Sequence, residues 1–295
     1  ADPKISLASF AGMFLAACVA EVDHGLAWGW LALTVLGVFC VEVAKNASGE
    51  LVDYDSGTDL AVDDADRSPF SGGKRVMVDG LLTRGQTRAL ALVFFLAAIM
   101  IGLVIVCWRD SRVLSFGLIG IALAWYYHGG SLRLSYRGFG ELAVALAYGP
   151  VVVCGTYFVQ TGYLSAPLLH VSMALGLLVA AFLWINEFPD YRADRQAGKN
   201  NLVVRLGPDR AAPGYVLVAT TGYAWLILTV IYYPTASGML VGMIGAFPAV
   251  FSAWRLLQSE GVTARLIPAQ MASLASFVLM AVGAGLGYLA NAWLQ

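Results

Sequence analysis

Long stretches without Asp, Glu, Lys or Arg are the feature that most limits what this chain can fold into. They run from Ile5 to Ala20, Gly25 to Val41, Ala89 to Trp108, Val113 to Leu132, Leu142 to Asn186, Ala211 to Trp254 and Leu266 to Gln295. A helix needs about 20 mostly apolar residues to cross a bilayer. A soluble fold is excluded, because 59% of the 295 residues are hydrophobic and the 13% that are charged cannot cover a water-exposed surface. The chain therefore folds in lipid.

Two of the runs are long enough for two helices each. The first breaks at T-G-Y-L-S-A-P, Thr161 to Pro167, and the second at Y-P-T-A-S-G, Tyr233 to Gly238, and both compositions favour turns. Only Lys4 precedes the first run in the basic position of a secretory signal, so that run is interpreted as the first helix. The sequence thus predicts an all-α integral membrane protein, a single domain over residues 1–295 with nine transmembrane helices.

The basic residues are distributed very unevenly between the two sides of such a bundle. If the nine helices alternate in direction, 16 of the 18 Lys and Arg residues fall on the side of the N-terminus, and only Arg109 and Arg112 fall on the other. Basic residues concentrate in cytoplasmic loops. We therefore expect a multi-pass protein of the cell membrane with its N-terminus and charged loops in the cytoplasm. The net charge of −1 gives no basic excess for binding nucleic acid.

Sixteen of the 19 acidic residues lie on the same predicted cytoplasmic side, and two groups of them have helical spacing. After the second apolar run, Asn46, Glu50 and Asp53 stand at i, i+4 and i+7 in V-E-V-A-K-N-A-S-G-E-L-V-D. These three side chains share one face if the helix continues.

The sixth predicted helix ends with the same kind of pattern. In W-I-N-E-F-P-D-Y-R-A-D, the residues Asn186, Asp190 and Asp194 are each four apart. One such group alone is typical of a solvated helix end. Two groups that both begin with Asn, leave the membrane on one side and precede a Gly-containing basic loop instead indicate a shared site.

Carboxylate and amide oxygens are ligands that suit Mg²⁺, which usually binds one or two carboxylates together with phosphate oxygens of a substrate. Two such faces opposed across a pocket could hold Mg²⁺ ions around a diphosphate, with cationic loop side chains on the remaining oxygens. The sequence therefore predicts a central pocket that is open to the cytoplasmic side and binds Mg²⁺ and a diphosphate.

The paired motifs, N-x3-E-x2-D and N-x3-D-x3-D-x4-K, resemble those of the UbiA superfamily of intramembrane prenyltransferases, whose members have nine helices. The resemblance covers nearly the whole chain. The segments Tyr126 to Leu142 and Asp190 to Gly207 are similar to the branch that prenylates 1,4-dihydroxy-2-naphthoate in menaquinone synthesis.

The first motif departs from the family pattern N-D-x-x-D. Gly49 and Glu50 replace its second Asn and its first Asp, so the charge is kept on an arm that is one methylene longer. Asp55 and Asp59 compete for the third acid, and Asp59 is included in the predicted site. In the second motif, Pro189 precedes the first Asp and removes a backbone donor.

The resemblance implies a Mg²⁺-dependent transfer of a prenyl chain from an allylic polyprenyl diphosphate to a lipid-soluble aromatic acceptor. It implies metal ligation by a set drawn from both motifs, namely Asn46, Glu50, Asp53, Asp59, Asp190 and Asp194. It implies substrate binding by Asn46, Asn186 and by cationic loop residues, namely Arg67, Lys74, Arg75, Arg133, Arg195 and Lys199. The cations are equally explained as residues that only orient the chain in the membrane.

Tyr126 and Tyr127 end the fourth helix at the level of the two motifs, where an aromatic face could stabilise an allylic cation. An interfacial aromatic belt explains both residues equally well. For the prenyl chain, helices that approach closely through small residues, as the Gly283, Gly285 and Gly287 run suggests, would shape an apolar groove.

Other functions stay open at this point. The acceptor could be 4-hydroxybenzoate or another quinone or lipid precursor in place of the naphthoate. A CDP-alcohol phosphotransferase would also use Mg²⁺, but its motif D-x2-D-G-x2-A-R is missing from the sequence. A transporter would place its carboxylates near the middle of the bilayer and not at helix ends.

Overall fold

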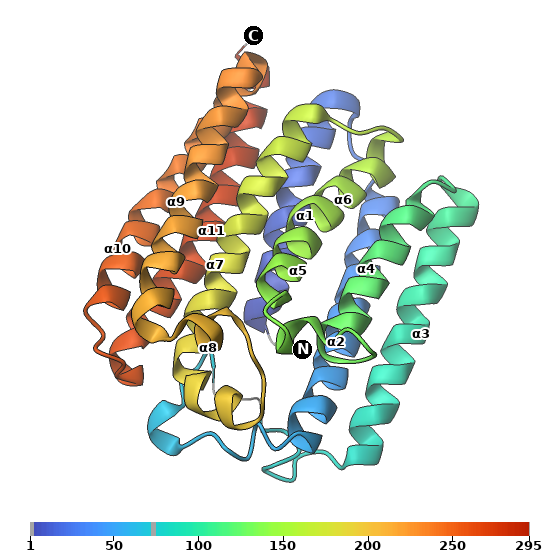
Figure 1. Cartoon of the computed structure of the whole chain (residues 1–295). Helices are drawn as coiled ribbons and strands as arrows, with labels where there is room; N and C mark the ends of the chain where they lie inside the picture. The colour runs from blue at the N-terminus through green and yellow to red at the C-terminus, as the bar shows by residue number, and fades with distance from the viewer. Residues whose placement is uncertain (1–2, 72–74, 295) are drawn as a thin grey trace.

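A computed structural model of the chain describes residues 3–71 and 75–294, and its regular structure is helical apart from an isolated bridge between Ser68 and Ser71 (Figure 1). The α-helices are α1 Pro3–His24, α2 Trp28–Asp55, α3 Arg84–Trp108, α4 Val113–His128, α5 Gly140–Leu146, α6 Val152–Thr161, α7 Ala166–Gln196, α8 Leu202–Leu206, α9 Pro208–Tyr232, α10 Ala246–Leu257 and α11 Thr263–Trp293. Shorter helical turns are η1 Asp64–Asp66, η2 Leu134–Tyr136, η3 Ala147–Val151 and η4 Pro234–Gly245. The prediction of an all-helical protein is confirmed.

Eight helical segments of the described chain are long and apolar enough to cross a membrane. Two of them combine elements, since α5, η3 and α6 form one segment from Gly140 to Thr161, and η4 with α10 forms another from Pro234 to Leu257. The remaining apolar helix, α4, has 16 residues. At about 1.5 Å per residue it is roughly 24 Å long, shorter than a hydrocarbon core of about 30 Å. A ninth crossing therefore stays a prediction.

The two predicted breaks within the longest runs are present. Helix α6 ends at Thr161 and is followed by Gly162, whose φ of 77° is the left-handed conformation that glycine adopts without strain. Ser165 then begins α7, its hydroxyl accepting a hydrogen bond from the Leu168 N–H. The second break is at Tyr233, between α9 and η4.

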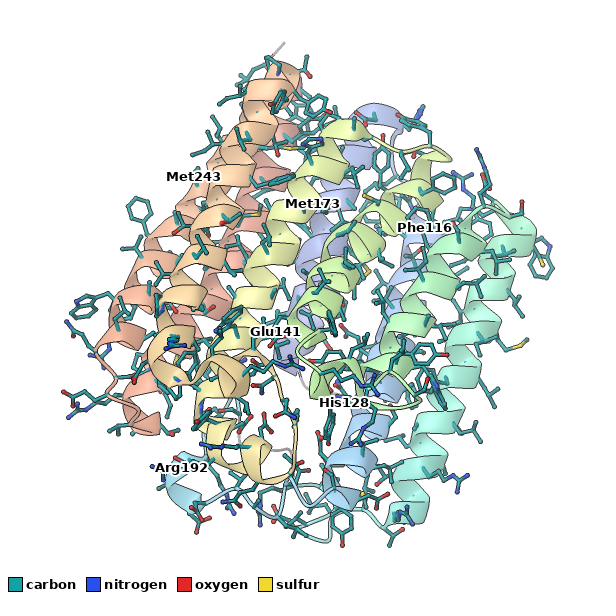
Figure 2. All side chains as sticks on the ribbon, in the orientation of Figure 1. Phe116, His128, Glu141, Met173, Arg192 and Met243 are labelled. Atoms are coloured by element: carbon teal, nitrogen blue, oxygen red, sulfur yellow. The ribbon has the colours of Figure 1, made fainter. Side chains whose placement is uncertain are left out.

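Three loops that contain charged residues lie at one end of the bundle. Residues 56–71, 75–83 and 197–207 gather at the lower end in Figure 1, residues 129–139 and the start of α1 lie in the lower half, and α11 finishes at the opposite end. His128, Glu141 and Arg192 lie in the lower half of the molecule, whereas Phe116, Met173 and Met243 lie in the upper half (Figure 2). We call the lower end the loop end.

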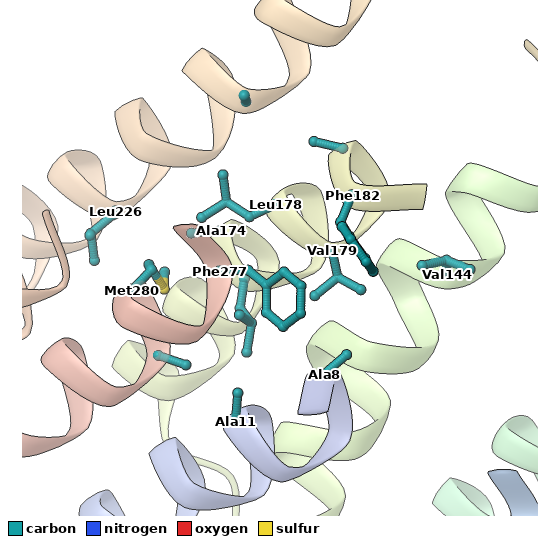
Figure 3. Close-up of a cluster of buried hydrophobic side chains, with 14 of the residues drawn as sticks. Ala8, Ala11, Val144, Ala174, Leu178, Val179, Phe182, Leu226, Phe277 and Met280 are labelled. Atoms are coloured by element: carbon teal, nitrogen blue, oxygen red, sulfur yellow. The ribbon is translucent and has the colours of Figure 1, made fainter. Parts of the chain in front are cut away.

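The core is centred on α7 and α11, whose apolar side chains meet those of α1, α5 and α9 (Figure 3). Phe277 of α11 lies 5.5 Å from Phe182 of α7, ring centre to ring centre. Small residues bring helices into backbone contact. A Cβ on Gly176 would lie 2.3 Å from the carbonyl oxygen of Ala145, and one on Gly287 would lie 2.0 Å from that of Gly238. Close packing at the predicted glycine run of α11 is thus confirmed.

Candidate active site

The first acidic group lies on one buried face of α2, because this helix continues through the motif to Asp55. Asn46 and Glu50 are buried, and Asp53 is half-buried one turn further on. Glu50 Oε1 accepts a hydrogen bond of 3.1 Å from the backbone N–H of Met77. The loop before α3 is thereby fixed against the face that bears the motif.

Gly49 lies on the same face and contacts an imidazole. A Cβ at this position would stand 2.8 Å from both Cδ2 and Nε2 of His128, the last residue of α4. The other side of the ring is held by Ser135, whose Oγ is 3.4 Å from Nδ1. Glycine at position 49 therefore makes room for the ring, which explains one of the two departures from the family motif.

The second acidic group lies on α7, which continues through Pro189 to Gln196. Asp194 is buried, and its Oδ2 accepts a 2.8 Å hydrogen bond from Nδ2 of Asn201. The Oδ1 atom of Asn201 accepts from the Val204 N–H and caps α8. Asp194 Oδ1 lies 3.4 Å from the ammonium of Lys199. The loop after α7 thus turns back onto its own acidic residues.

The two acidic faces meet at Lys199. Burial on its own would lower the pKa of this lysine, but the carboxylates of Asp194, Asp53 and Asp190 raise it well above its ordinary value. Tyr136, between α4 and α5, donates a 3.1 Å hydrogen bond to Asp53 Oδ1. Its carbonyl oxygen accepts from the Asn200 N–H, also at 3.1 Å. The ends of α2 and α7 and the loop before α5 therefore form one site.

Asp55 and Asp59 are clearly separated in the structure. Asp55 is exposed and pairs with Arg84 across 2.7 Å. Asp59 is buried, and burial together with the nearby carboxylates of Asp53 and Glu50 raises its pKa to about 7. The turn after α2 thus directs Asp59 toward the acidic face and Asp55 away from it.

The predicted cationic residues are found in different surroundings. Arg75 lies beside the site, donating from Nη1 to the carbonyl oxygen of Asp59 at 3.3 Å. Arg67 pairs with Asp64, and Arg195 is exposed and donates to the hydroxyl of Tyr191. The guanidinium of Arg133 lies 3.8 Å above the ring of Tyr136. Lys74 lies outside the described residues.

A cavity of about 500 Å³ extends from this region between α2, α3, α4 and the α5–α6 segment. Its wall is almost entirely apolar. Along α2 it reaches from Thr34 to Lys45, a span of about 16 Å at 1.5 Å per residue. Tyr127 lines the cavity, whereas Tyr126 lies against Gly130 in the turn after α4. Of the two predicted aromatic residues, Tyr127 is therefore the one on the cavity wall.

The side chains of the site have the chemistry to bind a divalent cation together with a diphosphate. Within the described residues no three His, Cys, Asp or Glu side chains form a complete cation site. Asn46 Nδ2 and Asn186 Oδ1 are buried without a hydrogen-bond partner in that part of the chain. A Mg²⁺ ion bound to these carboxylates would complete its coordination with diphosphate oxygens. The buried amides would then find their partners in the same Mg²⁺ diphosphate.

Several residues of the site were not singled out from the sequence. Tyr136 and Asn201 hold Asp53 and Asp194, and His128 packs on Gly49. Lys45 Nζ lies 4.3 Å from the centre of the Tyr127 ring. Lys45 directly precedes Asn46, and that adjacency was the one signal in the sequence that could have identified it.

Comparisons with known proteins agree with this arrangement. The model of the UbiA prenyltransferase family matches residues 9–263. The chain is 31% identical over 240 residues to the 1,4-dihydroxy-2-naphthoate octaprenyltransferase of Mycobacterium tuberculosis, which covers 81% of this chain and 78% of the relative. It is 30% identical over 192 residues to the 2-carboxy-1,4-naphthoquinone phytyltransferase of a Synechocystis strain, covering 63% of this chain and 59% of that protein.

Two solved structures share the fold. A UbiA homologue from Aeropyrum pernix superposes with a TM-score of 0.68 at 19% identity, over 94% of this chain and 96% of the other. A UbiA homologue from Archaeoglobus fulgidus, bound to GPP and Mg²⁺, superposes with a TM-score of 0.64 at 13% identity, over 98% and 100% of the two chains.

Proposed function

The chain belongs to the UbiA prenyltransferase family, and we propose that it transfers a prenyl chain from an allylic polyprenyl diphosphate to 1,4-dihydroxy-2-naphthoate. The observation that carries this proposal is the meeting of both acidic faces at Lys199, next to an apolar cavity. The naphthoate acceptor is supported by relatives that are named for naphthoate and naphthoquinone substrates.

Residues of both helices would hold the cations and the diphosphate. Asn46, Glu50, Asp53 and Asp59 supply oxygen ligands from the α2 side, and α7 supplies Asp190 and Asp194. Bound Mg²⁺ would neutralise the diphosphate and stabilise it as a leaving group. Asn186 and the loop cations, namely Arg67, Lys74, Arg75, Arg133, Arg195 and Lys199, are the proposed contacts for the remaining phosphate oxygens. Of these, Lys199 lies 3.4 Å from the Asp194 carboxylate, and Arg75 donates to the backbone carbonyl oxygen of Asp59.

The cavity supplies the conditions that an allylic cation requires. Its apolar wall accommodates the prenyl chain and keeps water away from the cation once the bond to the diphosphate breaks. Tyr127 on the cavity wall, or Tyr126 beside it, offers an aromatic face to the positive charge. The electron-rich acceptor then forms the new carbon–carbon bond and loses its carboxyl group as carbon dioxide, or loses a proton where no carboxyl group stands at the reacting carbon.

The test is a product assay with purified protein in detergent. Allylic prenyl diphosphates of several lengths are incubated with Mg²⁺ and a panel that includes 1,4-dihydroxy-2-naphthoate and 4-hydroxybenzoate, and the products are identified by mass. We expect prenylated 1,4-dihydroxynaphthalene, carbon dioxide and pyrophosphate as products. Prenylation of 4-hydroxybenzoate alone would reassign the acceptor, and the absence of any prenylated product would overturn the proposal.

We also propose nine membrane crossings, with the loop end in the cytoplasm. The odd number is supported by α1 and α11, which begin and finish at opposite ends of the bundle (Figure 1). The orientation is supported by the excess of Lys and Arg at the loop end. In a variant without the four native cysteines, a cysteine at exposed Ser111 should react with a membrane-impermeant maleimide in intact cells, and one at exposed Asp64 should not. The reverse pattern would overturn the orientation.

A further inference from the structure

Two loops that hold acidic residues of the candidate site also meet at the surface of the molecule. Residues 129–139, before α5, and residues 197–207, after α7, both lie in its lower half (Figure 1). The Arg205 side chain lies between them. Its Nε donates a 2.9 Å hydrogen bond to the Asn200 carbonyl oxygen, and a Cβ on Gly138 would stand 2.8 Å from the same nitrogen. Glycine at position 138 therefore leaves room for this arginine.

The contact lies where both loops lead into membrane-spanning segments. Phe139 directly precedes the segment that begins at Gly140, and Leu206 is two residues before the segment that begins at Pro208. Both side chains are exposed, Phe139 at 54% and Leu206 at 41%. Large apolar side chains that are exposed at this depth can insert among lipid acyl chains. The surface around Arg205 is therefore at the level of the lipid headgroups.

The charge of this surface is positive. Over residues 129–139 and 197–210, the exposed charged side chains are those of Arg137, Arg205 and Arg210, together with the acid Asp209. Within the described part of the chain, the Arg137 side chain forms neither a hydrogen bond nor an ion pair, and Arg205 bonds only to a carbonyl oxygen. Arginine binds phosphate through two parallel hydrogen bonds, and basic groups at the membrane surface attract anionic lipids.

We propose that Arg137 and Arg205 bind the headgroup phosphate of one anionic phospholipid, whose acyl chains pack on Phe139 and Leu206. The site lies outside the proposed active site and does not depend on the proposed reaction. A phospholipid matches both parts of the surface, since a soluble phosphate would leave the two apolar side chains uncovered. A zwitterionic phospholipid would bring a positive group of its own next to the arginines, so a lipid with net negative charge is favoured.

A lipid bound here would connect the loops that fix the acidic residues. Tyr136 of the first loop donates to Asp53, and Asn201 of the second donates to Asp194. A phosphate shared by the two arginines would link the loops within a few residues of both hydrogen bonds. Because a ligand stabilises the conformation that binds it, the lipid should make local opening of these loops less frequent.

The first measurement is of the lipids that the protein retains. The full chain in detergent is incubated with equal amounts of phosphatidylglycerol and phosphatidylcholine, and bound lipids are identified by native mass spectrometry. We expect the wild type to retain phosphatidylglycerol in preference to phosphatidylcholine. Arg137→Gln and Arg205→Gln should each lower the affinity for phosphatidylglycerol about fivefold, the contribution of one basic residue near an anionic membrane surface. Arg205→Lys, which keeps the charge without the planar guanidinium, should retain part of the affinity.

Arg88→Gln is the matched control, because it removes another exposed arginine, from the first turns of α3. It should keep the wild-type preference, and a decrease as large as that of Arg205→Gln would show only a general attraction to the positive surface and overturn the proposal. Displacement of phosphatidylglycerol by an equal concentration of glycerol 1-phosphate, which lacks acyl chains, would overturn it as well. Arg137 has no side-chain bond to lose within the described chain, so its variant decides the question even if Arg205→Gln fails to fold.

The second measurement is amide hydrogen exchange in peptides from residues 197–207. Phosphatidylglycerol should slow the exchange in the wild type but not in Arg137→Gln, and phosphatidylcholine should slow it in neither. Unchanged exchange in the wild type with phosphatidylglycerol bound would show that the lipid does not connect the two loops and would overturn that part of the proposal.

Discussion

The contact between Gly49 and His128 predicts that Gly49→Ala lowers the stability of the wild type but raises the stability of a variant that lacks the His128 ring. In Gly49→Ala the new methyl group would stand 2.8 Å from two ring atoms, closer than real Cβ contacts come. The ring cannot simply turn away, because Ser135 and Tyr127 flank it. Overpacking of this kind costs about 1–3 kcal/mol. The higher helix propensity of alanine relative to glycine offsets about 1 kcal/mol of this cost.

The net effect of Gly49→Ala in the wild-type background is therefore a loss of up to about 2 kcal/mol. In a His128→Ala background the collision is absent and only the helix preference remains, so the same substitution should stabilise by up to about 1 kcal/mol. Thermal unfolding in detergent, followed by intrinsic tryptophan fluorescence, measures the Tm of the wild type, both single variants and the double variant. Gly49→Ala should lower the Tm in the first background and raise it in the second.

Gly102→Ala provides the matched control, since this glycine is also inside a helix and a Cβ there would meet nothing within 4 Å. It should raise the Tm slightly in both backgrounds. Equal decreases from Gly49→Ala with and without His128 would show that the imidazole is not what position 49 must accommodate. An increase in both backgrounds would show that the ring moves aside at no cost.

Three further predictions concern the acidic residues. Asp53→Asn and Asp190→Asn should each lower turnover about 100-fold or more, which is the scale found when one group that stabilises developing charge is removed. The Tm of both variants should stay unchanged. Near wild-type rates in both variants would exclude these residues from the site. Glu50→Asp should keep partial activity with a higher Mg²⁺ requirement and Glu50→Ala should lose most of it, whereas identical Mg²⁺ titrations of turnover would leave Glu50 only its hydrogen bond to Met77. Because the pKa of Asp59 is raised to about 7, folding favours its protonated form, so stability in EDTA should fall as the pH rises from about 4 to 7. Asp59→Asn should therefore reduce the fall in Tm between pH 5 and pH 8. Parallel curves of Tm against pH for the wild type and the variant would contradict this prediction.

The helices could be predicted because the uncharged runs are the physical requirement for crossing a bilayer. Where a helix ends before the next charged residue, the length of the uncharged run overestimates the helix. The fourth run continues to Leu132, but α4 ends at His128, because Gly130 has a φ of 63° and the chain turns there. The spacing argument placed the motif residues on shared faces correctly, since both α2 and α7 continue past their motifs.

The partners of the acidic residues could not be predicted in the same way. Tyr136 is 83 residues from Asp53, and nothing in a single sequence relates the two positions. The choice between Asp55 and Asp59 depends on the turn that follows α2, where Ser56 bonds to the hydroxyl of Tyr136. Local spacing therefore identified the acidic faces, while the loops that complete the site are fixed only by tertiary contacts.

The electrostatics of the assembled site explain why both acidic faces are needed. The ammonium of Lys199 interacts with the carboxylates of Asp194, Asp53 and Asp190, so acidic side chains outnumber this lysine where the two faces meet. A trianionic diphosphate cannot approach such a site unless further positive charge comes with it. In the proposed reaction, divalent cations held by these carboxylates would supply that charge. In the proposed reaction, the carboxylates that would repel a diphosphate alone would therefore favour its complex with Mg²⁺.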